Sequence, residues 1–146
     1  MISEDKIKVL IEKAMEMRAN SYCLYSNYAV GAALLCEGDE VVGGCNVENA
    51  SFGGTICAER SAVSKAISDG KRSFFAIAIV GGPASKKGVL PKSEKYAFPC
   101  GICRQVLREF SNPATFQVIM ARGPEDYESY MLEELLPLSF GPEHLN

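Results

Sequence analysis

Cys57-Ala58-Glu59-Arg60 and Pro99-Cys100-Gly101-Ile102-Cys103 together hold three cysteines and one glutamate. Residues three apart at the start of a helix share one face, so Cys100 and Cys103 can hold the same metal ion. Thiolates bind Zn²⁺ in tetrahedral sites of four ligands, and a catalytic zinc keeps one position for water. With Cys57 as the third ligand, these stretches predict a site that holds one Zn²⁺ per chain and activates water.

Both cysteine stretches are expected to begin helices. The positive end of a helix dipole lowers the pKa of a thiol, which favours the thiolate that zinc requires. Positions 57 and 59 lie about 200° apart around a helix axis. Cys57 and Glu59 therefore converge only if their helix points its end, and not its side, at the metal.

Three thiolates on Zn²⁺ leave one net negative charge, which weakens the ability of the metal to acidify water. Arg60 and Arg104 each follow a cysteine motif, and we expect them to offset this charge together with the two helix dipoles. A solvated helix face is the alternative role for either arginine.

Two alternatives for the cysteines remain open. A zinc that only holds the fold together would take a fourth protein ligand, for which Cys23, Cys36, Cys45 or His144 is available. A zinc-free redox dithiol at Cys100-x-x-Cys103 is the other alternative. The glutamate beside Cys57 and the single CxxC motif favour the catalytic site.

Length and charge narrow the class of protein. The 146 residues are enough for one domain, residues 1–146, and the net charge of −3 disfavours long nucleic acids as partners. The apolar runs are strand-sized, so no membrane span is expected. The acidic start at residues 3–5 differs from a secretory signal, and a cytoplasmic location is expected.

Hydrophobic periodicity predicts an α/β layered fold with helices on both faces of one mixed sheet. Helices are expected at 4–19, 57–69, 101–110 and 131–136, and strands at 29–36, 40–46, 74–80 and 115–121. A turn region is expected between the last strand and the last helix. The long connection 81–98 is expected to be mobile or functional, and we interpret its lysines as solvated.

Six motifs occur in order along nearly the whole chain: Tyr22-Cys23-Leu24-Tyr25-Ser26, Val30-Gly31-Ala32-Ala33, residues 44–50, residues 57–60, residues 99–105 and Glu134-Leu135-Leu136-Pro137. With these motifs the chain resembles cytidine deaminases of the short, homotetrameric, zinc-dependent type. The resemblance implies a three-layer α-β-α sandwich with a mixed sheet of about five strands. It also implies a homotetramer in which neighbouring subunits complete the active sites.

The resemblance implies hydrolysis of cytidine and 2′-deoxycytidine to the uridines and ammonia, in pyrimidine salvage. Glu59 would move protons between water, N3 of the base and the leaving amine.

The same resemblance implies the contacts to a nucleoside substrate. Asn46 and Glu48 would bond the ribose hydroxyl, and Ala58 would offer its backbone N–H to the base. Tyr28 would lie against the base, and Phe140 would come from a neighbouring subunit.

Two other deaminase activities would use the same zinc-binding cysteines. A deaminase of another cytosine nucleoside, such as blasticidin S, would use the same three cysteines, but the segment 46–49 suits a ribose with a free 3′-hydroxyl. A deaminase that edits RNA or DNA would need a basic groove and aromatic platforms, and the acidic balance and the absence of tryptophan disfavour it.

Overall fold

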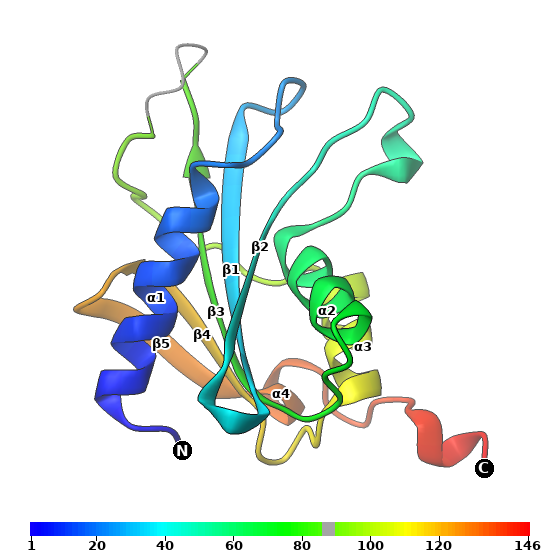
Figure 1. The fold of residues 1–146 in the computed structure, drawn as a ribbon. Coiled ribbons are helices and arrows are strands. Elements are labelled where there is room, and N and C mark those ends of the chain that lie inside the picture. The colour runs from blue at the N-terminus through cyan, green and yellow to red at the C-terminus, as the bar shows by residue number, and fades with distance from the viewer. Residues whose placement is uncertain (86–89) are drawn as a thin grey trace.

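The computed structural model describes residues 1–85 and 90–146, in which helices cover a five-stranded sheet (Figure 1). The elements follow in the order α1 (Glu4–Arg18), β1 (Tyr28–Cys36), β2 (Val41–Cys45), α2 (Ala58–Ser68), β3 (Phe74–Pro83), α3 (Gly101–Phe110), β4 (Gln117–Gly123), β5 (Asp126–Met131) and α4 (Leu132–Leu135). All four predicted helices are confirmed to within one residue at each end.

The sheet is mixed, with the strand order β2-β1-β3-β4-β5. Strand β3 runs parallel to β4, and the other neighbouring pairs are antiparallel. The predicted turn region before the last helix is wrong, because Asp126–Met131 forms the edge strand β5. An edge strand is only half covered, so its residues carry little of the apolar signal that marks a central strand.

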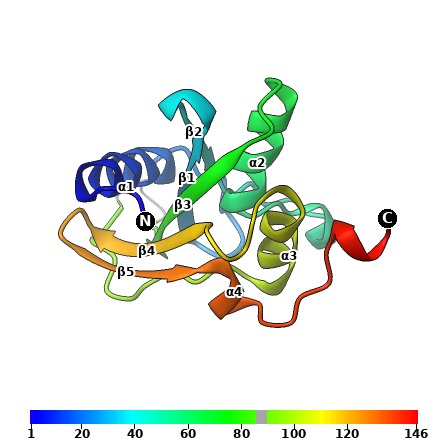
Figure 2. The ribbon, with the colours of Figure 1, turned by 90° about the horizontal axis from the view of Figure 1, so that it is seen from below.

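Helices cover both faces of the sheet, which confirms the predicted sandwich. Figure 2 shows α1 on one face and α2 and α3 on the other. The apolar stripe of α1, at Ile7, Leu10, Ile11 and Ala14, packs on one side of strands β1, β3 and β4. Side chains of α2 and α3 pack on the other side of the same strands.

Two glycines let helices approach the sheet closely. A Cβ at Gly44 in β2 would lie 2.4 Å from the backbone nitrogen of Ala62 in α2, and a Cβ at Gly31 in β1 would lie 1.9 Å from the carbonyl oxygen of Ala14 in α1. Any larger residue would push the helix away. Gly44 therefore sets the distance between the sheet and the helix that begins at Cys57.

The connections 19–27 and 46–57 and the described parts of the connection after β3, residues 84–85 and 90–99, lie at one end of the sheet, where α2 begins (Figure 1). Side chains from these connections come together there to form the candidate site. Two of the lysines interpreted as solvated, Lys86 and Lys87, lie outside the described residues. None of the described helices combines the length and apolar character that a membrane span needs.

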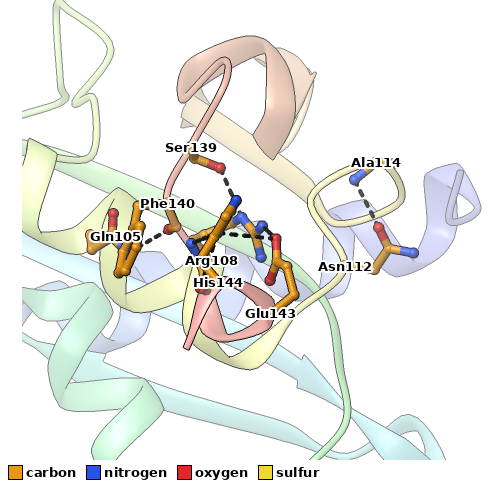
Figure 3. A network of polar contacts seen from close by, with 9 residues as sticks. Gln105, Arg108, Asn112, Ala114, Ser139, Phe140, Glu143 and His144 are labelled. Carbon is orange, nitrogen blue, oxygen red and sulfur yellow. Dashed lines mark hydrogen bonds and ion pairs between the residues drawn. The ribbon is translucent and has the colours of Figure 1, made fainter. Parts of the chain in front are cut away.

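The C-terminal segment folds back on α3 (Figure 3). Arg108 of α3 forms an ion pair with Glu143 and donates a hydrogen bond to Ser139 Oγ at 2.8 Å. Gln105 donates to the carbonyl oxygen of Phe140 at 2.9 Å. These contacts fix the backbone of the tail, while Phe140 itself stays 56% exposed.

Candidate metal centre and cleft

Three thiols meet where two helices begin. Cys57 is the N-cap residue of α2 and Cys100 is the N-cap residue of α3, so each helix points its end at the cluster, as predicted. The Sγ atoms of Cys57 and Cys100 lie 3.9 Å apart, and those of Cys100 and Cys103 lie 3.4 Å apart.

These spacings fit zinc. All three Sγ atoms lie within 4.8 Å of one another. Tetrahedral zinc with bonds of about 2.3 Å separates its sulfur ligands by about 3.8 Å. Among the described residues, no fourth histidine, cysteine or carboxylate joins this group. Three thiolates without a fourth protein ligand are the donor set of a catalytic rather than a structural zinc site.

The thiols compete for ionisation when no cation lies between them. The hydrogen bond from Cys103 lowers the pKa of Cys57, and Arg60 lowers it further, although burial alone would raise it. The same hydrogen bond and burial raise the pKa of Cys103. Because a metal ion binds thiolates, a dication at the centre removes this conflict.

Arg60 and Arg104 have different partners. The guanidinium of Arg60 lies 3.7 Å from Cys57 Sγ and 3.5 Å from the carbonyl oxygen of Thr55. Arg104 instead donates to the carbonyl oxygens of Pro99 at 2.9 Å and Leu135 at 2.7 Å. Arg60 therefore faces the sulfurs, whereas Arg104 joins α3 to the segment before it and to α4.

Glu59 lies beside the cluster and is almost completely buried, with 4% of its surface exposed. Burial raises its pKa to about 7, and the negative charge on Cys57 adds to this effect. A carboxyl group with a pKa near neutrality can both accept and return a proton.

Glu59, Cys57 and Cys100 line one cavity of about 550 Å³. The predicted substrate residues Tyr28, Asn46, Glu48 and Ala58 line the same cavity. The structure thus brings together residues from four separate stretches of the sequence. This volume is in the range of small-molecule sites.

The side-chain amide of Asn46 makes most of its hydrogen bonds within the fold. Its Oδ1 accepts from the backbone N–H of Val30 at 2.9 Å and from the hydroxyl of Ser21, and its Nδ2 donates to the carbonyl oxygen of Tyr28 at 2.8 Å. An amide has two N–H donors, so one donor is left for a ligand.

Glu48 is anchored to the connection that precedes β1. Its carboxylate accepts from the backbone N–H groups of Tyr25 at 3.0 Å and Ser26 at 3.1 Å, and from the Ser26 hydroxyl at 2.5 Å. Burial alone would raise the pKa of Glu48, but these three hydrogen bonds outweigh it and lower the pKa. The carboxylate is therefore held ionised and in one orientation.

Phe140 is the one predicted substrate-binding residue that lies away from the cavity. Phe140 does not line the cavity of its own chain; its ring stacks on His144 with the centroids 5.2 Å apart. Cys23, Cys36 and Cys45 are free and lie outside the cluster. His144 bonds the backbone of Gly141.

Sequence reasoning missed part of the cleft wall. Tyr96, Ala97 and Phe98 line the cavity from the segment directly before Pro99. Their position next to the CxxC motif is a signal that could have identified them. Ser26, from one of the motifs quoted above, also lines the cavity, and its hydroxyl donates to the carboxylate of Glu48.

Comparisons with known proteins agree with this geometry. Residues 4–120 match the family model "Cytidine and deoxycytidylate deaminase zinc-binding region". A cytidine deaminase of Halalkalibacterium halodurans is 42% identical over 139 residues, which are 95% of this chain and 97% of that protein.

A solved structure of cytidine deaminase from Burkholderia pseudomallei is 40% identical and superimposes with a TM-score of 0.78, over 90% of this chain and 97% of that chain. A blasticidin-S deaminase of Bacillus cereus is 30% identical over 115 residues, which are 79% of each protein. The chain therefore belongs to the zinc-binding family of cytidine and deoxycytidylate deaminases.

Proposed function

We propose that this protein hydrolyses cytidine to uridine and ammonia, with one zinc ion held by Cys57, Cys100 and Cys103. The observation that carries the proposal is that two of three thiols spaced for zinc, those of Cys57 and Cys100, line the same cavity as the buried Glu59. The relatives named cytidine deaminase, which match over nearly the whole chain, support it.

When bound, zinc supplies the Lewis acidity that makes water a nucleophile near neutral pH. Glu59 accepts a proton from the attacking water as the C4–O bond forms. Glu59 passes this proton to N3. It then takes a second proton from the new C4 hydroxyl and delivers it to the exocyclic nitrogen, and the C4–N bond breaks to release ammonia as the C4=O bond forms.

The chain's own groups orient the nucleoside. The free N–H of Asn46 and the anchored carboxylate of Glu48 face the ribose hydroxyl. The backbone N–H of Ala58 belongs to the first turn of α2, where amides have no partner within the helix, and it can bond the base. The ring of Tyr28 packs against the base.

The two arginines act differently in this proposal. Arg60 offsets the surplus negative charge of the three thiolates, because its guanidinium lies against Cys57. Arg104 fixes the start of α3, and so the position of Cys100 and Cys103, through its bonds to Pro99 and Leu135.

We extend the proposal to 2′-deoxycytidine as a second substrate, to pyrimidine salvage as the role, and to the cytoplasm as the location. We also propose a homotetramer in which Phe140 reaches the cleft of a neighbouring subunit. The half-exposed ring of Phe140 on a fixed tail supports this last step. A long nucleic acid is not the proposed substrate, because the chain carries a net charge of −3.

Deamination of blasticidin S is the second candidate, and the relative of that name favours it. A turnover assay separates the candidates. It measures the loss of absorbance with four substrates in parallel: cytidine, 2′-deoxycytidine, blasticidin S and a cytosine-containing oligonucleotide. We expect rapid turnover of the two free nucleosides. Faster turnover of blasticidin S or of the oligonucleotide would overturn the proposal.

A further inference from the structure

The wall segment, residues 91–98, has no helix or strand of its own, and its last three residues form one wall of the cleft. Tyr96, Ala97 and Phe98 line the cavity, and Cys100 follows directly after Pro99. A segment without regular structure needs other contacts to hold its shape, because its backbone N–H and C=O groups make no hydrogen bonds of a helix or a sheet.

Arg18, the last residue of α1, supplies such contacts. Its guanidinium donates to the carbonyl oxygens of Ala29 at 2.9 Å, Pro83 at 3.0 Å and Pro91 at 3.0 Å. One side chain thus joins the start of β1, the end of β3 and the start of the wall segment. Only 6% of Arg18 is exposed.

Two glycines at the end of β3 leave room for the guanidinium of Arg18 and for the wall segment. A Cβ at Gly82 would lie 2.9 Å from Arg18 Nη2 and 3.0 Å from Ser93 Oγ. A Cβ at Gly81 would lie 2.8 Å from the Cβ of Ala97. The buried hydroxyl of Ser93 donates to the carbonyl oxygen of Gly81, which draws the wall segment onto these two glycines.

A second arginine holds the same segment from the end of β4. Arg122 donates to the carbonyl oxygen of Glu94 at 2.9 Å and lies over the ring of Tyr96, 4.8 Å from its centre. Tyr96 in turn donates to Asp126 at 2.5 Å. Of the two arginines, Arg18 is the buried one and donates to three carbonyl oxygens, whereas Arg122 also pairs with the Asp126 carboxylate.

We propose that Arg18 is a positioning residue for the reaction, which holds the wall segment 91–98 in the shape that binds the nucleoside. The inference rests on the proposed function for its substrate. A guanidinium can bridge three carbonyl oxygens at once, whereas a methionine can bond none and a lysine ammonium cannot reach all three in this geometry.

The test uses Arg18→Met and Arg18→Lys in the zinc-loaded protein, with Arg72→Met as the matched control. Arg72 also donates to two carbonyl oxygens, those of Ile67 and Lys71, but it lies outside the cleft lining. For Arg18→Met we expect KM for cytidine to rise about tenfold while kcat changes by less than about threefold, with Arg18→Lys intermediate. Arg72→Met leaves both constants unchanged.

Amide hydrogen exchange gives a readout that does not depend on activity. We expect residues 92–98 to exchange faster in both Arg18 variants, with the strands β3 and β4 unchanged. Unchanged exchange in 92–98, or an unchanged KM in an active Arg18 variant, would overturn the inference. A wild-type protein that is inactive on cytidine refutes the proposed function instead, and the exchange data then decide the role of Arg18 alone. If Arg18→Met does not fold, Arg18→Lys decides both readouts.

Discussion

The Sγ atoms of Cys57 and Cys100 lie 3.9 Å apart, although 43 positions separate these residues in the sequence. Each residue is the N-cap of its helix, so the two helix ends face each other across the place where a metal ion fits. The position of α2 against the sheet and the shape of the segment before α3 together set this distance.

Cys100→Ser should lose zinc and activity together. Serine is a poor zinc ligand, and two thiolates alone hold the ion weakly. Metal analysis of the purified variant should find far less than one zinc per chain. Cys23→Ser is the control, because Cys23 lies outside the cluster and should keep its full zinc content. Full zinc content in Cys100→Ser would mean that another residue completes the site.

Gly44→Ala should destabilise the protein by about 1–3 kcal/mol, because the added methyl group meets the backbone of α2 at Ala62. Denaturant unfolding measures the change in free energy. Gly53→Ala is the matched control, since a Cβ there has nothing within 4 Å. Equal stabilities of the two variants would show that α2 does not depend on this close approach.

Asn46→Ala should lower the free energy of unfolding by about 1–3 kcal/mol, because the backbone N–H of Val30 and the carbonyl oxygen of Tyr28 lose their buried partner. It should also raise KM for cytidine. Asn20→Ala, at an exposed position after α1, should change neither quantity. An unchanged stability would contradict the structural role assigned to the amide.

The stability contributed by Asp126 should depend on pH. The hydrogen bond from Tyr96, together with Arg122, keeps the pKa of Asp126 below its ordinary value of 3.8. A carboxyl group with a depressed pKa in the folded state stabilises the fold above the unfolded pKa and loses this contribution as the pH falls through the folded pKa. The Tm difference between the wild type and Asp126→Asn should be largest above about pH 4 and shrink below it. A difference that grows on acidification would contradict this assignment.

The sequence predicted the elements and the metal ligands because both have local signals. The apolar stripe of α1 and the spacing of Cys100 and Cys103 can be read without knowing the fold. Strand β5 escaped prediction because it is a half-covered edge, and its alternating residues resemble a polar turn. Arg18 escaped because its partners are backbone carbonyl oxygens, and so did the bond of Arg122 to the carbonyl oxygen of Glu94, because such bonds leave no trace in the residue types of the segment they hold.

The partners of Arg60 and Arg104 likewise could not be predicted from the sequence. Both arginines follow a cysteine motif in the sequence, yet only the fold shows that Arg60 faces a sulfur and Arg104 faces two carbonyl oxygens. Local spacing places a residue on a helix, but the partner of its side chain depends on tertiary packing.

The central claim is that Glu59 moves protons beside a zinc held by three cysteines. Its most direct test measures cytidine turnover and zinc content together in the wild type, in Glu59→Gln and in Glu12→Gln, an exposed control on α1. We predict about one zinc per chain in all three proteins, with turnover reduced at least about 100-fold in Glu59→Gln alone. Turnover near that of the wild type in zinc-loaded Glu59→Gln would contradict the account.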